Sequence, residues 1–452
     1  MTPPFLAQSS VSVDAQLGFV LDSLTTLPGI SAAVLGISVV AISIALKKVV
    51  PVMSGLAMYF VTFQLNPTLQ SNTLIPILQS TRLAAKSIAF ALLVLTIAFV
   101  PALPRSGRRT TVGAAAIGLL GFQLFYAIQL SLFAGDGLMK GVFGVIAISL
   151  MFGVCAWGFG RQANDAASAR AALATLSWAG IGFIASNFLQ IIVDPGGALM
   201  ALRLAGTAGN AQMMGGTATI LLLAASYQFA SRSSSEAVKW INLAMICVLG
   251  SMVLATGSRT AAMATVVGVA VFFRSEIGKF ILLAVVLALG FVLLSVTVES
   301  SARLTFDRFS EGQDTRGAVW SEALAIFYAS PIFGEFPFLQ SGQEPNGIES
   351  TFIRTLANMG LVGATVLAVP LLFIFRDLLR VIQLSRSSPE YRRLCDFYLS
   401  SCASLLVLNI FDGYAFGFMT LPVMFMYLVL SVGSLIVDQP DGTETDIAAE
   451  ES

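Results

Sequence analysis

Apolar runs of about 20 residues recur along almost the whole chain, and they constrain its fold more than any other feature. A helix rises about 1.5 Å per residue, so a run of this length matches the ~30 Å hydrocarbon core of a membrane. The chain is 56% hydrophobic and only 11% charged, whereas soluble proteins have about 25% charged residues. The sequence therefore predicts an all-α polytopic membrane protein.

The pattern predicts about 12–13 transmembrane helices, with one large loop late in the series. The apolar runs cover residues 29–46, 49–65, 84–103, 111–132, 139–160, 173–193, 213–230, 238–255, 260–273, 278–298, 351–375, 396–411 and 415–437. The ninth run is short, which is typical of a broken or tilted helix. We therefore divide the chain into helices 1–10 (1–298), a large loop (299–350), the C-terminal helices (351–437) and a disordered acidic tail (438–452).

Most of the 25 lysines and arginines fall in alternate loops, and the positive-inside rule identifies that side as the cytoplasm. The amino terminus and the large loop are then outside, and the acidic tail is inside. A smaller basic set falls on the outer side: Arg82, Lys86, Lys140, Arg203, Arg259, Arg303, Arg308, Arg316 and Arg354. An outer arginine such as Arg259 runs against the charge bias, which argues for a function of that residue.

Composition also excludes several classes of function. The formal net charge is zero, so no overall field attracts nucleic acid. The chain has no histidine, which removes histidine acid–base catalysis and most zinc sites. Its four cysteines form no CxxC motif, so neither a disulfide framework nor a metal cage is expected.

Three outer segments place an arginine at a membrane boundary: RLAGTAGNAQMMGG (203–216), TGSRT (256–260) and the large loop with ESTFIRTLANMGLVG (349–363). In TGSRT, Ser258 is the expected N-cap of the ninth run, and Arg259 falls in its first turn. The free N–H groups of a helix start and a guanidinium together make an anion site. Alternatively, Arg259 only extends to the interface and fixes the topology.

These segments resemble the O-antigen polymerase and ligase superfamily, whose members carry an R-x-x-G motif with a downstream Asn, a [TS]-G-S-R-[TG] signature and a large outer loop. The matching residues are Arg203, Gly206 and Asn210 in the first motif, Thr256, Gly257, Ser258 and Arg259 in the second, and Arg316, Trp320, Pro331 and Gly334 in the loop. The resemblance covers about residues 195–375. It implies a GT-C-type, O-antigen ligase-like fold.

The resemblance also implies a membrane glycosyltransferase that needs no metal and no cofactor and uses a glycan on undecaprenyl diphosphate as donor. Arg203 and Arg259 would grip the diphosphate. Arg316, Arg354, Asn210, Ser258 and Trp320 are the expected substrate-binding residues. The implied place is the bacterial inner membrane with the site facing the periplasm. The implied partners are lipid-linked repeat units and the flippase and chain-length regulator of the same pathway.

One departure from the family concerns the base. In the ligases a histidine lies eleven positions before a glycine at the start of the span after the large loop. Counting back from Gly360 gives Glu349 instead. A carboxylate can also deprotonate an acceptor hydroxyl, so Glu349 is the candidate base; alternatively, it is an acid favoured by a helix start. The other acids of the loop stay open for this role: Asp307, Glu311, Asp314, Glu335 and Glu344.

The missing histidine favours a polysaccharide polymerase over the alternative, a ligase that moves the glycan to lipid A core or protein. A second alternative is a flippase or transporter, since these classes have a similar number of spans. Coupled carriers place charges inside the spans. Here nearly all charges fall at segment ends, and Asp412 is expected in a tight outer turn. The sequence therefore favours the polymerase, which would make O-antigen, capsule or exopolysaccharide.

Overall fold

The computed structural model of the 452-residue chain describes residues 49–63, 76–100, 112–133, 137–162, 166–200, 203–231, 235–276, 278, 281, 315–335, 348–387 and 391–438. The predicted run 29–46, almost all of the run 278–298 and the acidic tail after residue 438 lie outside these residues. The four-part division of the chain and the total of 12–13 spans stay predictions.

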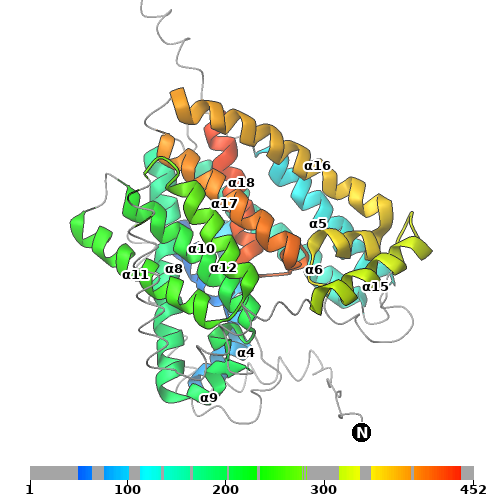
Figure 1. The fold of residues 1–452 in the computed structure, drawn as a ribbon, viewed down its shortest axis with the longest axis horizontal. Coiled ribbons are helices and arrows are strands. Elements are labelled where there is room, and N and C mark those ends of the chain that lie inside the picture. Colours follow the sequence, from blue (N-terminus) through cyan, green and yellow to red (C-terminus); the bar gives the residue numbers. More distant parts are fainter. Residues whose placement is uncertain are drawn as a thin grey trace, which may run out of the picture.

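The described part of the chain is almost entirely helical (Figure 1). Its α-helices are α3 (Val49–Phe60), α4 (Pro76–Phe99), α5 (Ala114–Phe133), α6 (Gly137–Phe152), α7 (Phe159–Gln162), α8 (Ala166–Val193), α9 (Pro195–Ala198), α10 (Ala211–Ala230), α11 (Glu236–Ala255), α12 (Arg259–Phe272), α15 (Thr315–Ala329), α16 (Thr351–Ser387), α17 (Arg392–Phe411) and α18 (Leu421–Val437). A π-helical segment, η3 (Gly153–Gly158), joins α6 to α7. Two short 3-10 turns are η4 (Gly206–Ala208) and η6 (Tyr414–Phe416). The strands β1 (Leu199–Met200) and β2 (Arg203–Leu204) form a small antiparallel hairpin.

Seven helices of the described part are long and apolar enough to cross a membrane. They are Ala114–Leu132, Gly141–Arg161, Ala169–Val193, Ala211–Ala230, Glu236–Ala255, Thr351–Ser387 and Arg392–Phe411. Three shorter apolar helices are Ala84–Phe99, Arg259–Phe272 and Leu421–Val437. The prediction of an all-α polytopic membrane protein is confirmed, and so is the short ninth run, which forms the 14-residue α12.

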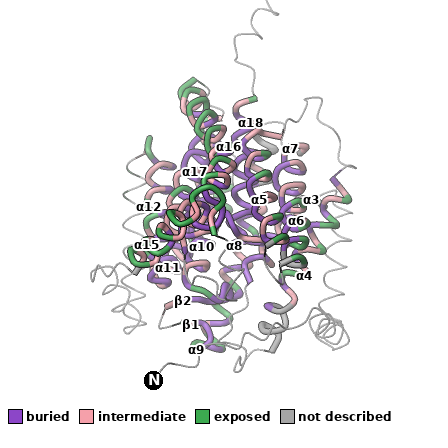
Figure 2. The backbone as a smooth tube through the Cα atoms, turned by 90° about the vertical axis from the view of Figure 1, so that its right-hand side faces the viewer, coloured by how far each residue is buried: buried purple, intermediate pink, exposed green. Residues whose placement is uncertain are grey.

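Helix α10 lies in the centre of the bundle, where nearly all its residues are buried, and it packs against α8, α11, α12 and α17 (Figure 2). Two glycines at its start allow close approach of its neighbours. A Cβ on Gly215 would lie 2.6 Å from the Cβ of Ala261, and one on Gly216 would lie 2.4 Å from the Tyr414 hydroxyl. The start of α10 is therefore locked against α12 and η6.

Helix α16 differs from its predicted run, 351–375, because it continues to Ser387. The extension carries arginines, and a helix with charged side chains can continue from the hydrocarbon into water. The length of the apolar run alone therefore underestimates the length of α16. The backbone breaks at Gly360, whose φ of 59° and ψ of −155° suit only glycine. The segment before this break lies beside α15 (Figure 1).

Candidate active site

The R-x-x-G segment (203–206) forms the strand β2, which pairs with β1, and the first residue of the turn η4. The sequence did not predict this hairpin or this turn. Gly206 and Gly209 take positive φ angles of 50° and 66°, which explains why glycine suits these two turn positions. The Arg203 Nε donates a hydrogen bond of 2.7 Å to the Thr256 carbonyl oxygen. The structure thus brings the first arginine segment into contact with TGSRT, 53 positions away.

TGSRT makes the turn between α11 and α12. Gly257 has a positive φ of 57°, and Ser258 follows as the N-cap of α12, because the Ala261 N–H donates to its Oγ at 3.3 Å. The Thr256 hydroxyl accepts a hydrogen bond from the Ser258 N–H at 3.2 Å. The predicted N-cap is confirmed, and Arg259 is the first residue of α12 and exposed.

Arg316, the second residue of α15, links three separate parts of the chain. Its Nε donates to Glu349 Oε2 at 3.1 Å. Its Nη2 donates to Thr260 Oγ1 at 2.9 Å and to Asp412 Oδ1 at 3.3 Å. The large loop is therefore joined to the start of α12, next to Arg259, by one guanidinium.

Glu349 lies two residues before the start of α16 and is held from both sides. Its Oε1 accepts a hydrogen bond of 2.6 Å from the Gln212 Nε2, while its Oε2 accepts from Arg316. Asn210 fixes the backbone of Gln212, because its side chain caps α10 by accepting a hydrogen bond from the Gln212 N–H at 2.7 Å. A carboxylate has about four lone-pair positions, so Glu349 can still accept a proton from a third group. Its side chain is 31% exposed, which makes it accessible.

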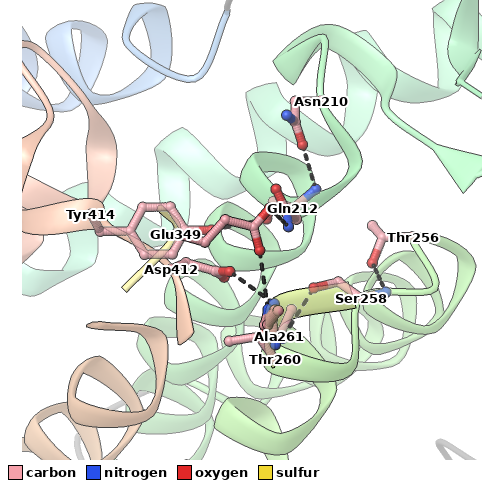
Figure 3. Close-up of polar contacts among 10 residues, drawn as sticks. Asn210, Gln212, Thr256, Ser258, Thr260, Ala261, Glu349, Asp412 and Tyr414 are labelled. Atoms are coloured by element: carbon pink, nitrogen blue, oxygen red, sulfur yellow. Dashed lines mark hydrogen bonds and ion pairs between the residues drawn. The ribbon is translucent and has the colours of Figure 1, made fainter. Parts of the chain in front are cut away.

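Asp412 is the second carboxylate of the site, and it lies in the turn after α17. Burial raises its pKa to about 7 and the nearby Glu349 charge adds to this effect, whereas Arg316 opposes it. Tyr414 closes the site from η6: its hydroxyl donates to the Gln212 carbonyl oxygen at 3.0 Å (Figure 3). Asp412 was expected in an outer turn and has no assigned role in the sequence analysis.

Other residues of this site were not found from the sequence. Gln212 and Thr260 fall inside two of the three outer segments but are ordinary helix-start residues without a charge signal. Tyr414 follows Asp412 by two positions, and only the fold brings it to α10. A lone acid in an outer turn between two spans is the one signal that could have singled out Asp412.

The remaining predicted site residues have different neighbours. The Arg354 Nη2 donates to the Tyr126 hydroxyl at 3.4 Å, and its guanidinium lies 4.9 Å from the Phe416 ring centre. The Trp320 ring stacks on Phe411 at a centroid distance of 6.2 Å. Their roles in substrate binding stay predictions.

Of the alternative loop acids, Glu335 is the one that lies within the described residues. Glu335 is exposed, and its N–H donates to the Ala357 carbonyl oxygen at 2.9 Å. Asp307, Glu311, Asp314 and Glu344 lie outside the described residues. Among the loop acids that the structure describes, Glu349 is the one that an arginine and a glutamine hold beside TGSRT.

TGSRT, a loop arginine and an acid before a span thus meet at one place. Residues 243–368 match the family model described as O-antigen ligase. The resemblance to the O-antigen polymerase and ligase superfamily is confirmed by this match. No curated protein matches the chain.

The part matched by the O-antigen ligase model contains TGSRT, α12, α15 and the first half of α16. It therefore includes Arg259, Arg316 and Glu349. Arg203 and Asp412 lie outside it and reach the same site through the contacts with Thr256 and Arg316. A glycosyltransferase-like enzyme class and a multi-pass membrane protein follow from the match and the helices.

Proposed function

We propose that the protein is a polysaccharide polymerase. It transfers a growing glycan from undecaprenyl diphosphate to a hydroxyl of another lipid-linked repeat unit. The reaction takes place on the periplasmic face of a bacterial inner membrane, without a metal or cofactor. The observation that carries this proposal is the bridge from Arg316 to Glu349 and to Thr260, the residue that directly follows Arg259 in TGSRT.

The two motif arginines support a diphosphate site. Arg203 is tied by its Nε to the TGSRT backbone, and Arg259 is exposed at the start of α12. A helix start carries unsatisfied N–H groups and the positive end of the helix dipole. Guanidinium groups bind phosphate oxygens bidentately. Together they suit an anion that gains negative charge during the reaction.

Glu349 is the group that we assign as base. The acceptor hydroxyl oxygen attacks the anomeric carbon of the donor, and its proton passes to the Glu349 carboxylate. The bond between the anomeric carbon and the diphosphate oxygen breaks, and its electron pair stays on that oxygen. The fixed arginines stabilise the new charge, which is usually the largest contribution to catalysis. Direct displacement inverts the anomeric centre.

The expected partners follow from this reaction. Both substrates are lipid-linked repeat units in the membrane, and a flippase of the same pathway must bring them to the outer face. A chain-length regulator is a further expected partner.

The alternative within the superfamily is a ligase, which the description of the matched family model favours. The acid at position 349, where the ligases have histidine, favours the polymerase.

The purified protein in nanodiscs should be incubated with a lipid-diphosphate repeat unit in EDTA, and the products separated by length. A ladder of products supports the polymerase, whereas transfer of one block to an added lipid A core supports the ligase. Arg203→Ala and Arg259→Ala should abolish the ladder while the protein stays folded. Glu349→Gln should do the same, and a normal ladder in that variant would contradict its role as base.

A further inference from the structure

On α16 beyond the break at Gly360, most exposed side chains as far as Leu379 are apolar and form a stripe, with Thr365 and Arg376 as the exceptions. Its exposed positions recur every three to four residues, as expected for one face of a helix. They include Leu361, Val369, Leu372, Phe375 and Leu379. Because α16 is long and apolar enough to span a membrane, this stripe is its lipid-facing side. The stripe begins at Leu361, since residues 351–360 are buried or half-buried.

The turn after α15 is fixed by its backbone to the place where this stripe begins. The Leu361 N–H donates to the Pro331 carbonyl oxygen at 2.9 Å, and the Val362 N–H donates to the Ile332 carbonyl oxygen at 3.1 Å. A Cβ on Gly360 would lie 2.4 Å from the Ile332 carbonyl oxygen. The break in α16 therefore exposes N–H groups that the turn satisfies, and it allows the two backbones to touch.

Large apolar side chains project from this turn and from the end of α15. Tyr328 is 75% exposed, Ile332 58% and Phe333 66%. Their neighbour across the backbone contact, Leu361, is 51% exposed. An exposed apolar group of this size, continuous with a lipid-facing stripe, is typical of a surface that lipid covers.

The exposed face of α15 changes in polarity along the helix. Ser321 and Glu322 are exposed in its middle, whereas Tyr328 is exposed in its last turn. The other side of α15 is tied down: Ala323 packs with Ile348 and Ala357 in a small apolar cluster. The helix therefore presents a polar middle and an apolar end to its surroundings.

We propose that the last turn of α15 and the turn Pro331–Gly334 are inserted into the outer leaflet of the membrane. Tyr328, Ile332 and Phe333 extend the lipid-facing stripe of α16 into the headgroup boundary, while Glu322 stays in water. Aromatic residues with one polar end are common at this depth. The inference does not depend on the reaction that the site catalyses.

This anchor has a consequence for the site. Helix α15 is held at one end by lipid and by the backbone contacts at Gly360, and at the other end by the ion pair of Arg316 with Glu349. The anchor and the ion pair together fix how α15 lies across the site.

The proposal can be tested by placing a spin label at Phe333→Cys and, as matched control, at Glu322→Cys. The labels are compared in nanodiscs, in full-length protein whose four native cysteines are replaced by alanine. Collision with oxygen, which concentrates in lipid, and with a water-soluble nickel chelate is measured for each label. At position 333 oxygen should be the more effective relaxant, and at position 322 the nickel chelate.

Similar nickel accessibility at both positions would overturn the proposal. Tyr328→Cys serves as a second site if the label at position 333 prevents folding, and the same result is expected there. A further variant, Phe333→Asp, should lower product formation several-fold in nanodiscs, whereas Phe333→Leu should keep it. Loss of all activity in the parent protein would contradict the proposed polymerase but would leave the collision result intact.

Discussion

The Arg316 guanidinium donates a 2.9 Å hydrogen bond to the Thr260 hydroxyl, although 56 positions separate the two residues. Each is the second residue of its helix, so the contact joins the start of α15 to the start of α12. The same guanidinium binds Glu349 and Asp412. The direct link between the candidate base and TGSRT therefore depends on one side chain, while Gln212 holds the base from its other side.

This dependence predicts the effect of Arg316→Lys. A lysine keeps the positive charge, but its single nitrogen cannot occupy both the Nε position that serves Glu349 and the Nη2 position that serves Thr260 and Asp412. We expect turnover to fall by about 100-fold, the scale for loss of one preorganised donor. The measurement is the rate of product formation at saturating donor. Lys239→Gln, at the exposed ion pair with Glu236, is the control and should leave the rate unchanged.

The N-cap of α12 gives a second prediction. Ser258→Ala removes the acceptor of the Ala261 N–H, which should lower the free energy of unfolding by about 1 kcal/mol and loosen the turn that carries Arg259. Ser235→Ala is a matched control, because Ser235 caps α11 by accepting from the Val238 N–H. Thermal unfolding should report a loss in both variants, whereas only Ser258→Ala should raise the donor KM. An equal donor KM in both would contradict a role of this cap in diphosphate binding.

The local parts of the site could be predicted from the sequence. Ser258 precedes an apolar run, and a serine there satisfies N–H groups that a helix start leaves open. The spans follow from apolar length, which is a local property. Even so, α16 is longer than its apolar run, because a helix with exposed arginines can continue beyond the hydrocarbon into water.

The meeting of distant segments could not be predicted in the same way. Arg316 contacts Glu349 and Asp412 across 33 and 96 positions. These contacts depend on how α15 packs against α16 and on where the turn after α17 lies. No periodicity carries that information. The family resemblance gave Arg316 and suggested Glu349, but Asp412, Gln212 and Tyr414 became visible only in the fold.

The break in α16 gives a third prediction. Gly360→Ala places a methyl group 2.4 Å from the Ile332 carbonyl oxygen, at a φ angle that alanine rarely adopts. We expect the free energy of unfolding to fall by roughly 1–3 kcal/mol. Gly121→Ala is the control, since the added methyl meets open space inside α5 and should be neutral or slightly stabilising. A chemical or thermal unfolding series would distinguish the two.

Buried Arg82 holds the turn η4, which follows the Arg203 strand, and gives a fourth prediction. Its Nη2 donates to the Gly206 carbonyl oxygen at 2.8 Å and to Gln190 Oε1 at 2.9 Å. Arg82→Ala leaves the Gln190 Oε1 without its donor, at about 1–3 kcal/mol for a buried group. It also removes one of the two hydrogen bonds that the Gly206 carbonyl oxygen accepts, since the Gly209 N–H still donates to it. We expect a lower unfolding midpoint together with a higher donor KM. Lys86→Ala, one turn further along α4 and exposed, should change the unfolding midpoint much less.

Asp412 predicts how the site responds to pH. Its pKa of about 7 means that it is mainly protonated at pH 6 and mainly ionised at pH 8. Ionisation adds a negative charge close to Arg316, which weakens the attraction of the site for a diphosphate. The donor KM should therefore rise as the pH increases through about 7. In Asp412→Asn it should stay flat over the same range.

The same titration links Asp412 to stability. Folding raises the pKa of this acid from its ordinary value near 4, so the folded protein binds the proton more tightly than the unfolded chain. The stability contributed by Asp412 is complete below about pH 4 and is lost as the pH rises to about 7. Asp412→Asn cannot ionise at this position. Its free energy of unfolding, relative to that of the natural protein, should therefore be higher at pH 8 than at pH 5. Parallel changes in both proteins between these pH values would assign the titration to another group.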